Sequence, residues 1–298
     1  MTREHDLEHL ASTAHRAAAV VGLSTRGMRL LRDHGTAVFH LSAECTVARV
    51  ATGPDAVAAA ERAVAITRWL GQQDFPAVQP LPVEQPVRLD AHTVTFWHYH
   101  PQPAGGVPID PVHLARLLRR LHALPPPPVE LPAYRPLAHF TETVRTSIGA
   151  LTDRDRDWLL TRSRELLEEY VGLEFPLGVG HIHGDAYPGN LLRAEHDRVL
   201  LADWDETATG PRELDLVNTY QGTRYGRTAE QLQAFSATYG NDITTWSGFP
   251  VLRALRDLHT LGSFIRHADN ADQAAAAQLA HRLSTLRAGD DTALWVSR

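Results

Sequence analysis

The stretch from His183 to Asn190 constrains this chain more than any other, because it places ion-binding side chains around a forced turn. The preceding residues, 177–182, are largely apolar and predict a packed segment that delivers Asp185 into a loop. A Pro-Gly pair then turns the chain, so that Asn190 returns beside the Asp185 carboxylate. The sequence therefore predicts a loop that clamps an ion between a carboxylate and a carboxamide.

A second carboxylate, Asp203, follows thirteen residues after Asn190. Residues 191–193 and 198–202 predict two short strands joined by a polar turn over 194–197. The second strand ends at Asp203. A hairpin is therefore expected to carry Asn190 and Asp203 to one end.

The spacing of Asp185, Asn190 and Asp203 is that of a phosphoryl-transfer site. In that template one Asp orients the acceptor hydroxyl, an Asn five positions on binds magnesium, and a further Asp bridges magnesium to the nucleotide phosphates. We therefore predict that Asp185 is catalytic and that Asn190 and Asp203 hold Mg²⁺, with ATP or GTP as co-substrate.

Two other interpretations compete with this one. His181, His183 and Asp185 match the His-x-His-x-Asp start of a binuclear metallohydrolase site, which would suit zinc. That interpretation lacks a His directly after Asp185 and leaves Asn190 and Asp203 without a role. A purely structural polar loop is the other alternative, because a motif match alone carries a risk of error.

On these residues the chain resembles the aminoglycoside phosphotransferase family, small-molecule kinases that share the protein-kinase architecture. His183-Gly184-Asp185 with Asn190 is similar to the catalytic loop of that family, and Ala202-Asp203-Trp204 to its metal-binding segment. The resemblance extends to Glu213–Val217, where Asp215 is expected to brace the catalytic loop, and it implies that His183 supports the loop as well. It covers most of the chain.

The resemblance implies an α+β, two-lobed fold. Residues 1–99 would form a small nucleotide-binding lobe with an antiparallel sheet and one helix. Residues 100–298 would form a larger, mainly helical lobe that carries catalysis and acceptor binding. Runs rich in β-branched residues over 36–41 and 46–51 agree with the hairpin of a small lobe.

All 29 Lys and Arg residues of the chain are arginine. Kinases of this superfamily use a strand lysine, paired with a helix glutamate, to hold phosphates. By resemblance Arg49 takes the position of the lysine, and 33–36, with Gly35, take that of the nucleotide-covering loop. An ordinary exposed arginine remains the alternative at position 49, since the pattern does not determine which way the side chain faces.

A helix is expected over 55–70, and within it Glu61 is the natural partner of Arg49. A solvated glutamate remains the alternative there. The alternating segment Val94–Tyr99 predicts the last strand of the small lobe and a hinge at which Trp97, His98 and Tyr99 contact a purine ring. Further helices are expected over 111–124, 153–170 and 251–287.

Composition indicates a cytoplasmic enzyme. The single cysteine, Cys45, cannot form an internal disulfide, and no stretch approaches the ~18 apolar residues of a membrane span. The net charge of -6 argues against a nucleic-acid partner. We expect neither a nucleic acid nor a membrane to be a partner.

These observations predict a magnesium-dependent phosphotransferase that acts on a small hydroxylated acceptor. Aminoglycosides, macrolides, hydroxy amino acids, choline and sugars all remain open as acceptors, because the acidic residues of the large lobe are equally consistent with a solvated surface. A nucleotide-binding pseudokinase that acts as a scaffold is the alternative, favoured by the missing lysine.

Overall fold

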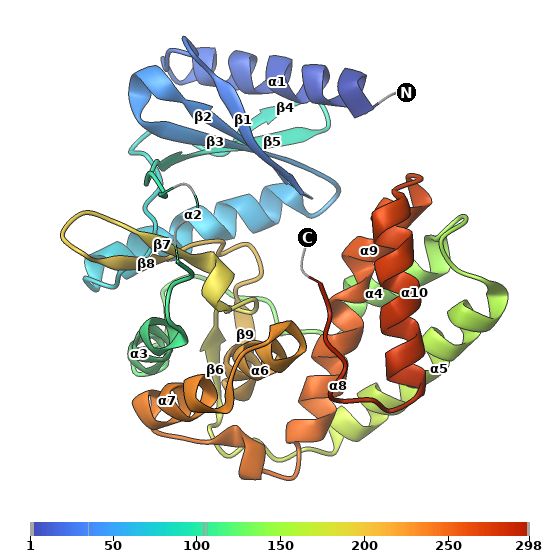
Figure 1. Cartoon of the computed structure of the whole chain (residues 1–298). Helices are drawn as coiled ribbons and strands as arrows, with labels where there is room; N and C mark the ends of the chain where they lie inside the picture. Colours follow the sequence, from blue (N-terminus) through green and yellow to red (C-terminus); the bar gives the residue numbers. More distant parts are fainter. Residues whose placement is uncertain (1–2, 35, 104, 106, 297–298) are drawn as a thin grey trace. The chain divides into compact units, whose positions relative to one another are not determined.

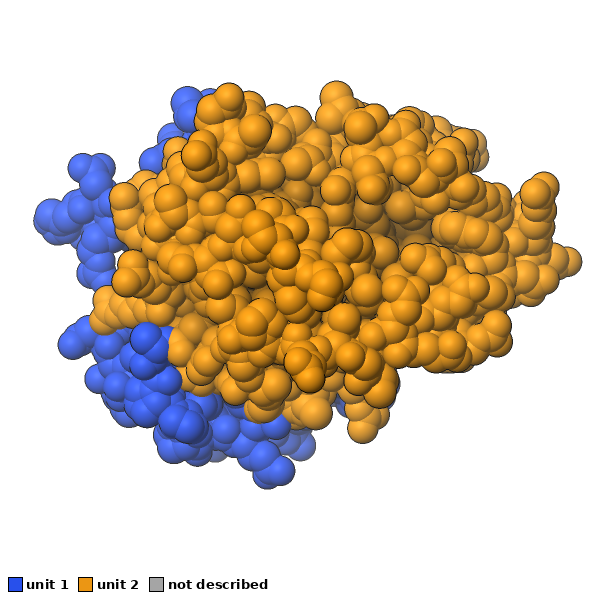
Figure 2. Space-filling model, turned by 90° about the horizontal axis from the view of Figure 1, so that it is seen from below, with its two compact units in different colours: residues 1–109, 123–131, 189–207 blue, residues 110–122, 132–188, 208–298 orange. Residues whose placement is uncertain are grey.

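The computed structural model describes residues 3–34, 36–103, 105 and 107–296. The chain divides into two compact units, each discontinuous in sequence (Figure 2). The first comprises Met1–Ile109, Ala123–Leu131 and Gly189–Thr207, and the second comprises Asp110–His122, Pro132–Pro188 and Ala208–Arg298. The functional division into lobes 1–99 and 100–298 stays a prediction.

The first unit is built on an antiparallel sheet with the strand order β1-β2-β3-β5-β4 (Figure 1). A separate hairpin pairs β7 with β8, and Ala77 forms a bridge to Leu201 of β8. The elements are α1 (Arg3–Val20), β1 (Arg29–His34), β2 (Thr36–Leu41), β3 (Thr46–Thr52), α2 (Ala56–Gln72), β4 (Val87–Leu89), β5 (His92–His98), β7 (Leu191–Arg193) and β8 (Val199–Leu201), with 3₁₀ helices η1 (Ser42–Glu44) and η2 (Pro188–Asn190), the latter beginning in the second unit.

The sheet buries one face against α1. Ala14, Ala17 and Ala18 of this helix are fully buried and share a cluster with Ala48 and Val50 of β3. Successive side chains of a strand point to opposite faces, so Arg49 faces away from α1. The alternation along β3 therefore determines the direction of the Arg49 side chain, which the sequence pattern left open.

The second unit is mainly helical, with one small antiparallel pair of strands, β6 and β9. Its elements are α3 (Pro111–Leu121), α4 (Ala138–Thr146), α5 (Asp153–Val171), β6 (Val179–Ile182), β9 (Ala208–Pro211), α6 (Glu213–Gln221), η3 (Gly222–Tyr225), α7 (Ala229–Tyr239), η4 (Ile243–Thr245), α8 (Phe249–His259), α9 (Leu261–Asp269) and α10 (Gln273–Arg287). Every helix among the described residues is too short or too polar to cross a membrane.

Helix α3 shows why the apolar pattern predicts a helix here. The Asp110 side chain accepts a hydrogen bond from the Val112 N–H, and Pro111 occupies the first turn, where its missing N–H costs nothing. The predicted leucine stripe is buried; it consists of Leu114, Leu117, Leu118 and Leu121. The helix ends at Leu121 and not at the expected Leu124.

Two expectations about helices are wrong. The expected helix over 251–287 is divided into α8, α9 and α10. The break before α10 contains Ala271 at a positive φ of 62°, and the Asp272 side chain caps the new helix at the Ala275 N–H. Helix α1 was not expected, because the residues that it buries are small alanines and give no strong apolar stripe.

Candidate active site

The hairpin β7–β8 brings Asn190 and Asp203 to one end, as predicted. Strand pairing sets Leu191 opposite Leu201, and the Ala202 N–H donates to the Asn190 carbonyl at 2.9 Å. Asn190 is buried at 4% exposure, in a short 3₁₀ helix that begins at the proline of the forced turn. The backbone at Asn190 and at Asp203 is therefore positioned by the same hydrogen-bonded pair of strands, β7 and β8.

Asp203 has a left-handed backbone, with φ 67°, which is uncommon outside glycine and concentrated at functional sites. The next residue anchors it. Trp204 is 2% exposed, its indole N–H donates to the Leu201 carbonyl at 3.0 Å, and its ring packs edge-on against Phe75. The buried tryptophan thus explains how the chain maintains the strained conformation of the aspartate before it.

Arg49 bridges two aspartates. Its Nη2 lies 2.7 Å from Asp203 Oδ1 and 2.7 Å from Asp205 Oδ2, and its Nη1 donates to Asp205 Oδ1 at 3.3 Å. Burial alone would lower the pKa of Arg49, but the Asp205 and Asp203 carboxylates outweigh it and raise that pKa above its ordinary value. The guanidinium is therefore charged and compensates both acids.

Two further arginines contact the acidic segment, residues 203–205. Arg32 of β1 lies 3.7 Å from Asp203 Oδ2, and Arg62 of α2 donates to the Asp205 carbonyl at 3.0 Å. Neither belongs to a motif, so no sequence pattern marks them as site residues. The sheet and α2 bring them to the acidic segment.

The predicted pair between Arg49 and Glu61 is wrong. Glu61 pairs with Arg88 of β4 at 2.5 Å, and both side chains are more than half exposed. Arg49 is drawn instead to two carboxylates, which outweigh a single one. The exposed Glu61–Arg88 pair contributes ~0–1 kcal/mol to stability. Gly35, the other residue expected near phosphate, lies outside the described residues.

The expected hinge is engaged in local hydrogen bonds. The His98 N–H donates to the Gln79 carbonyl at 3.1 Å, and the Tyr99 N–H donates to the Cys45 carbonyl at 3.0 Å. The Trp97 side chain is 5% exposed and its indole donates to Thr95. Contact of this segment with a purine ring stays a prediction.

In the second unit, Asp215 holds the loop that carries Asp185. Asp215 is fully buried, and its carboxylate accepts the His183 N–H at 2.8 Å and the Gly184 N–H at 2.9 Å. His122 Nε2 lies 3.0 Å from the same carboxylate. Burial alone would raise the pKa of Asp215, but the His122 hydrogen bond, nearby charge and the His183 N–H lower it overall.

Both histidines of the alternative zinc motif have structural contacts. His183 is fully buried and its Nδ1 accepts the Asp185 N–H at 3.3 Å, while His181 Nε2 lies 2.9 Å from the Leu121 carbonyl. Within the described ranges, no group of three or more His, Cys, Asp or Glu side chains could hold a metal ion. These contacts favour the phosphoryl-transfer interpretation over the metallohydrolase one.

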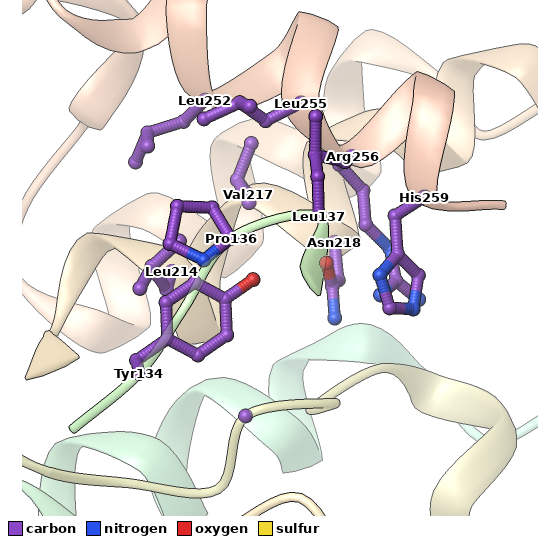
Figure 3. Close-up of a pocket in the computed structure, with 11 residues that line it drawn as sticks. Tyr134, Pro136, Leu137, Leu214, Val217, Asn218, Leu252, Leu255, Arg256 and His259 are labelled. Carbon is purple, nitrogen blue, oxygen red and sulfur yellow. The ribbon is translucent and has the colours of Figure 1, made fainter. Parts of the chain in front are cut away.

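Asp185 itself pairs with an arginine that no motif marks. Arg256 of α8 places Nη2 2.7 Å from Asp185 Oδ1, and the two side chains are 15% and 27% exposed. Arg256 also lines a pocket in the second unit (Figure 3). The lining residues are Tyr134, Pro136, Leu137, Gly184, Leu214, Val217, Asn218, Leu252, Leu255, Arg256 and His259.

The donor set of the first unit fits magnesium. Mg²⁺ prefers oxygen ligands and is held in proteins by one or two carboxylates with substrate phosphates and water. Asp203 supplies a carboxylate and Asn190 a carboxamide at one end of the same hairpin. Asp203 is paired here with Arg49 and lies 3.7 Å from Arg32, so a bound Mg²⁺ would take the place of an arginine at this carboxylate.

Comparison with known proteins agrees with this geometry. A model of the phosphotransferase enzyme family matches residues 28–258. No curated protein sequence matches the chain.

Several solved structures are similar. An amicoumacin kinase in complex with AMP-PNP, Ca²⁺ and Ami has 14% identity and a TM-score of 0.75, over 99% of this chain and 98% of that chain. A choline/ethanolamine kinase family protein from Mesorhizobium loti has 16% identity and a TM-score of 0.63, over 95% and 96%. The GDP and kanamycin complex of APH(2″)-IIia has 15% identity and a TM-score of 0.66, over 95% and 99%. The expected α+β, kinase-like fold is confirmed.

We predict that Asp215→Asn lowers the free energy of unfolding by about 1–3 kcal/mol, because a carboxamide cannot accept both loop N–H groups and leaves a buried donor unpaired. Urea unfolding followed by circular dichroism measures this. The same change at exposed Asp157 is the control and should have little effect. Equal stability of the two variants would show that Asp215 does not hold the loop.

We also predict that, in the absence of metal, Arg49→Ala lowers the free energy of unfolding by about 1–3 kcal/mol. This range lies between the values typical of exposed and of buried ion pairs. Mg²⁺ should then raise the melting temperature of this variant more than that of the wild type, because two carboxylates have lost their cation. Arg88→Ala, which breaks the surface pair with Glu61, is the matched control. An equal Mg²⁺ response in all three proteins would contradict the account.

Proposed function

Because the chain belongs to the phosphotransferase enzyme family, as the earlier resemblance implied, we propose that it transfers the γ-phosphate of ATP or GTP to a hydroxyl group of a small molecule. The single observation that carries the proposal is the hairpin that presents Asn190 and Asp203 together, with Arg49 paired to Asp203. Charge compensation of phosphate by a metal and an arginine is the main requirement of this chemistry.

Asp185 is proposed to orient the acceptor hydroxyl and to take its proton late in the transfer. The transition state of phosphoryl transfer is loose, so positioning matters more than the strength of the base. The loop supports such positioning, because Asp215 accepts two of its backbone N–H groups and His183 Nδ1 accepts the Asp185 N–H. A small shift of this loop would misplace the carboxylate.

Magnesium, held by Asp203 and Asn190, would neutralise charge on the nucleotide phosphates. Arg49 would contact the phosphates in place of the usual lysine, exchanging its pairs with Asp203 and Asp205 for phosphate oxygens. Its planar fork can bind phosphate through two parallel hydrogen bonds. Arg32 and Arg62 add positive charge on the same side.

A pseudokinase remains the second candidate, and one specific observation favours it. Both aspartates assigned to chemistry are ion-paired with arginines at 2.7 Å, Asp203 with Arg49 and Asp185 with Arg256. A scaffold would keep both pairs when nucleotide binds and would not consume it. A kinase must exchange at least the first pair for metal and phosphate.

We place the enzyme in the cytoplasm, where nucleoside triphosphates are available. Structural neighbours include kinases named for choline, aminopropanol and spectinomycin, so the family fold serves chemically different acceptors. The family fold by itself therefore does not specify the acceptor.

We predict that Asp203→Asn weakens the magnesium-dependent part of nucleotide binding. A neutral carboxamide would hold Mg²⁺ less tightly than a carboxylate, so the charge of the phosphates would be less well compensated. Isothermal titration with ATP and with GTP, in Mg²⁺ and in EDTA, measures it. Asp242→Asn, on an exposed loop of the second unit, is the control. Should Asp203→Asn keep the wild-type metal dependence, the assignment of Asp203 fails.

Asp185→Asn is expected to leave nucleotide affinity nearly unchanged and to lower turnover ~10²–10⁴-fold, the range for losing a positioned acid–base group. Steady-state kinetics together with nucleotide titration separate the two effects. Loss of nucleotide affinity equal to the loss of turnover would indicate a binding role for Asp185 instead.

A further inference from the structure

Two neighbouring residues of α8 contact different parts of the second unit. Arg256 contacts the loop that carries Asp185, with its Nη2 2.7 Å from Asp185 Oδ1. Asp257 contacts η3, where its Oδ2 accepts Nη2 of Arg224 at 2.9 Å and Nε at 3.3 Å. Successive residues of an α-helix have a fixed spacing and orientation, so a shift or rotation of α8 that breaks one contact also displaces the other. Both contacts therefore depend on one position of α8.

The pair of Arg224 and Asp257 is buried and well hydrogen-bonded. The two side chains are 1% and 3% exposed, and the second oxygen of Asp257 accepts the Gln221 side chain at 2.8 Å. A buried ion pair adds little net stability over apolar side chains, because desolvation offsets the attraction, and in some proteins its role is to permit a single arrangement. Gln221 ends α6 and Arg224 follows in η3, so this arrangement joins α8 to the end of α6.

The same two helices hold the loop that carries Asp185. From α6, Asp215 accepts the N–H groups of His183 and Gly184. From α8, Arg256 contacts the Asp185 carboxylate. The loop backbone is thus positioned by one helix and the carboxylate by the other, and both contacts require the two helices to be aligned. The buried Arg224–Asp257 pair lies where these helices are joined.

The segment 290–296 fastens Arg224 in turn, along a path beside α8 and α10 (Figure 1). Arg224 Nη1 donates to the Asp290 carbonyl at 2.6 Å, and the Trp295 N–H donates to the Arg224 carbonyl at 2.6 Å. Trp295 is 4% exposed, and the guanidinium carbon of Arg224 lies 4.4 Å from the centroid of its ring, a cation–π contact. Arg253 of α8 donates to the Asp291 carbonyl at 2.9 Å, which attaches the segment to this helix directly.

We propose that Arg224, Asp257 and Trp295 are positioning residues for the phosphotransfer reaction, which hold α8 where Arg256 contacts Asp185. The inference rests on the proposed function, in which Asp185 orients the acceptor hydroxyl. The three residues act on the reaction through Arg256. A misplacement of about 1 Å can lower a rate ~10²-fold, so a small shift of α8 is enough to affect turnover.

The first measurement uses the full chain without nucleotide. The coupling between Arg256 and Asp185 is the non-additive part of the effects of Arg256→Ala and Asp185→Ala on the free energy of unfolding, measured with urea. This coupling should be present in the wild type and should fall by more than half in an Asp257→Asn background. A merely structural Asp257 would lower the stability of all four proteins of the cycle and leave the coupling unchanged.

A second variant and a control keep this measurement decisive. Asp257→Asn leaves the charge of Arg224 uncompensated, which is strongly destabilising. Trp295→Leu keeps an apolar side chain and removes the ring, so it should also reduce the coupling by more than half, and Trp295→Phe should restore most of it. Asp269→Asn is the control, because Asp269 accepts hydrogen bonds from the loop 147–150 and should lower stability without changing the coupling.

The second measurement is phosphate release from MgATP with water as the acceptor. Asp257→Asn and Trp295→Leu should slow this release at least about tenfold, because Asp185 is misplaced. Their affinity for MgATP, measured by calorimetry, should stay close to that of the wild type. In an Arg256→Ala background the same two substitutions should change the rate little, because the contact that they position is already absent.

The inference is overturned if the coupling persists in both Asp257→Asn and Trp295→Leu. It is equally overturned if these variants slow phosphate release by the same factor with and without Arg256. Failure of the proposed function is recognised separately. A wild type that binds no MgATP, or that releases no phosphate from it to water or to any hydroxylated acceptor, loses the function, whereas the coupling is measured without nucleotide.

Discussion

Pairing of half-buried carboxylates with arginine is the interaction on which the candidate catalytic residues depend. In the first unit Arg49 holds Asp203 and Asp205, and in the second unit Arg256 holds Asp185. A chain without lysine must use a large, planar and permanently charged group for both tasks. Each pair places a cation against a carboxylate that we assign to metal binding, at Asp203, or to orienting a hydroxyl, at Asp185.

The backbone is organised around these pairs by buried neighbours. Trp204 anchors the left-handed turn at Asp203, and Asp215 ties down the loop before Asp185 through two N–H groups. Preorganisation of this kind is what phosphoryl transfer requires, since the protein contributes mainly position and charge.

Sequence reasoning succeeded where the determinants are local. Residue spacing over short stretches of the chain predicted the Pro-Gly turn, the β7–β8 hairpin and the leucine stripe of α3. The structure contains all three. It failed for Glu61, because the choice between Arg49 and Arg88 depends on how β3, β4 and α2 pack. Arg256 and Asn218 carry no motif, and only the folding of α6 and α8 places them in one pocket.

The central claim is that the chain is a working phosphotransferase and not a nucleotide-binding scaffold. The most direct measurement is ³¹P nuclear magnetic resonance of the wild type with MgATP or MgGTP and a mixture of hydroxylated acids, amino alcohols and antibiotics. The account predicts a new phosphomonoester signal that grows as the γ-phosphate signal declines. Nucleotide that binds in a magnesium-dependent way and yet stays intact with every acceptor would contradict it.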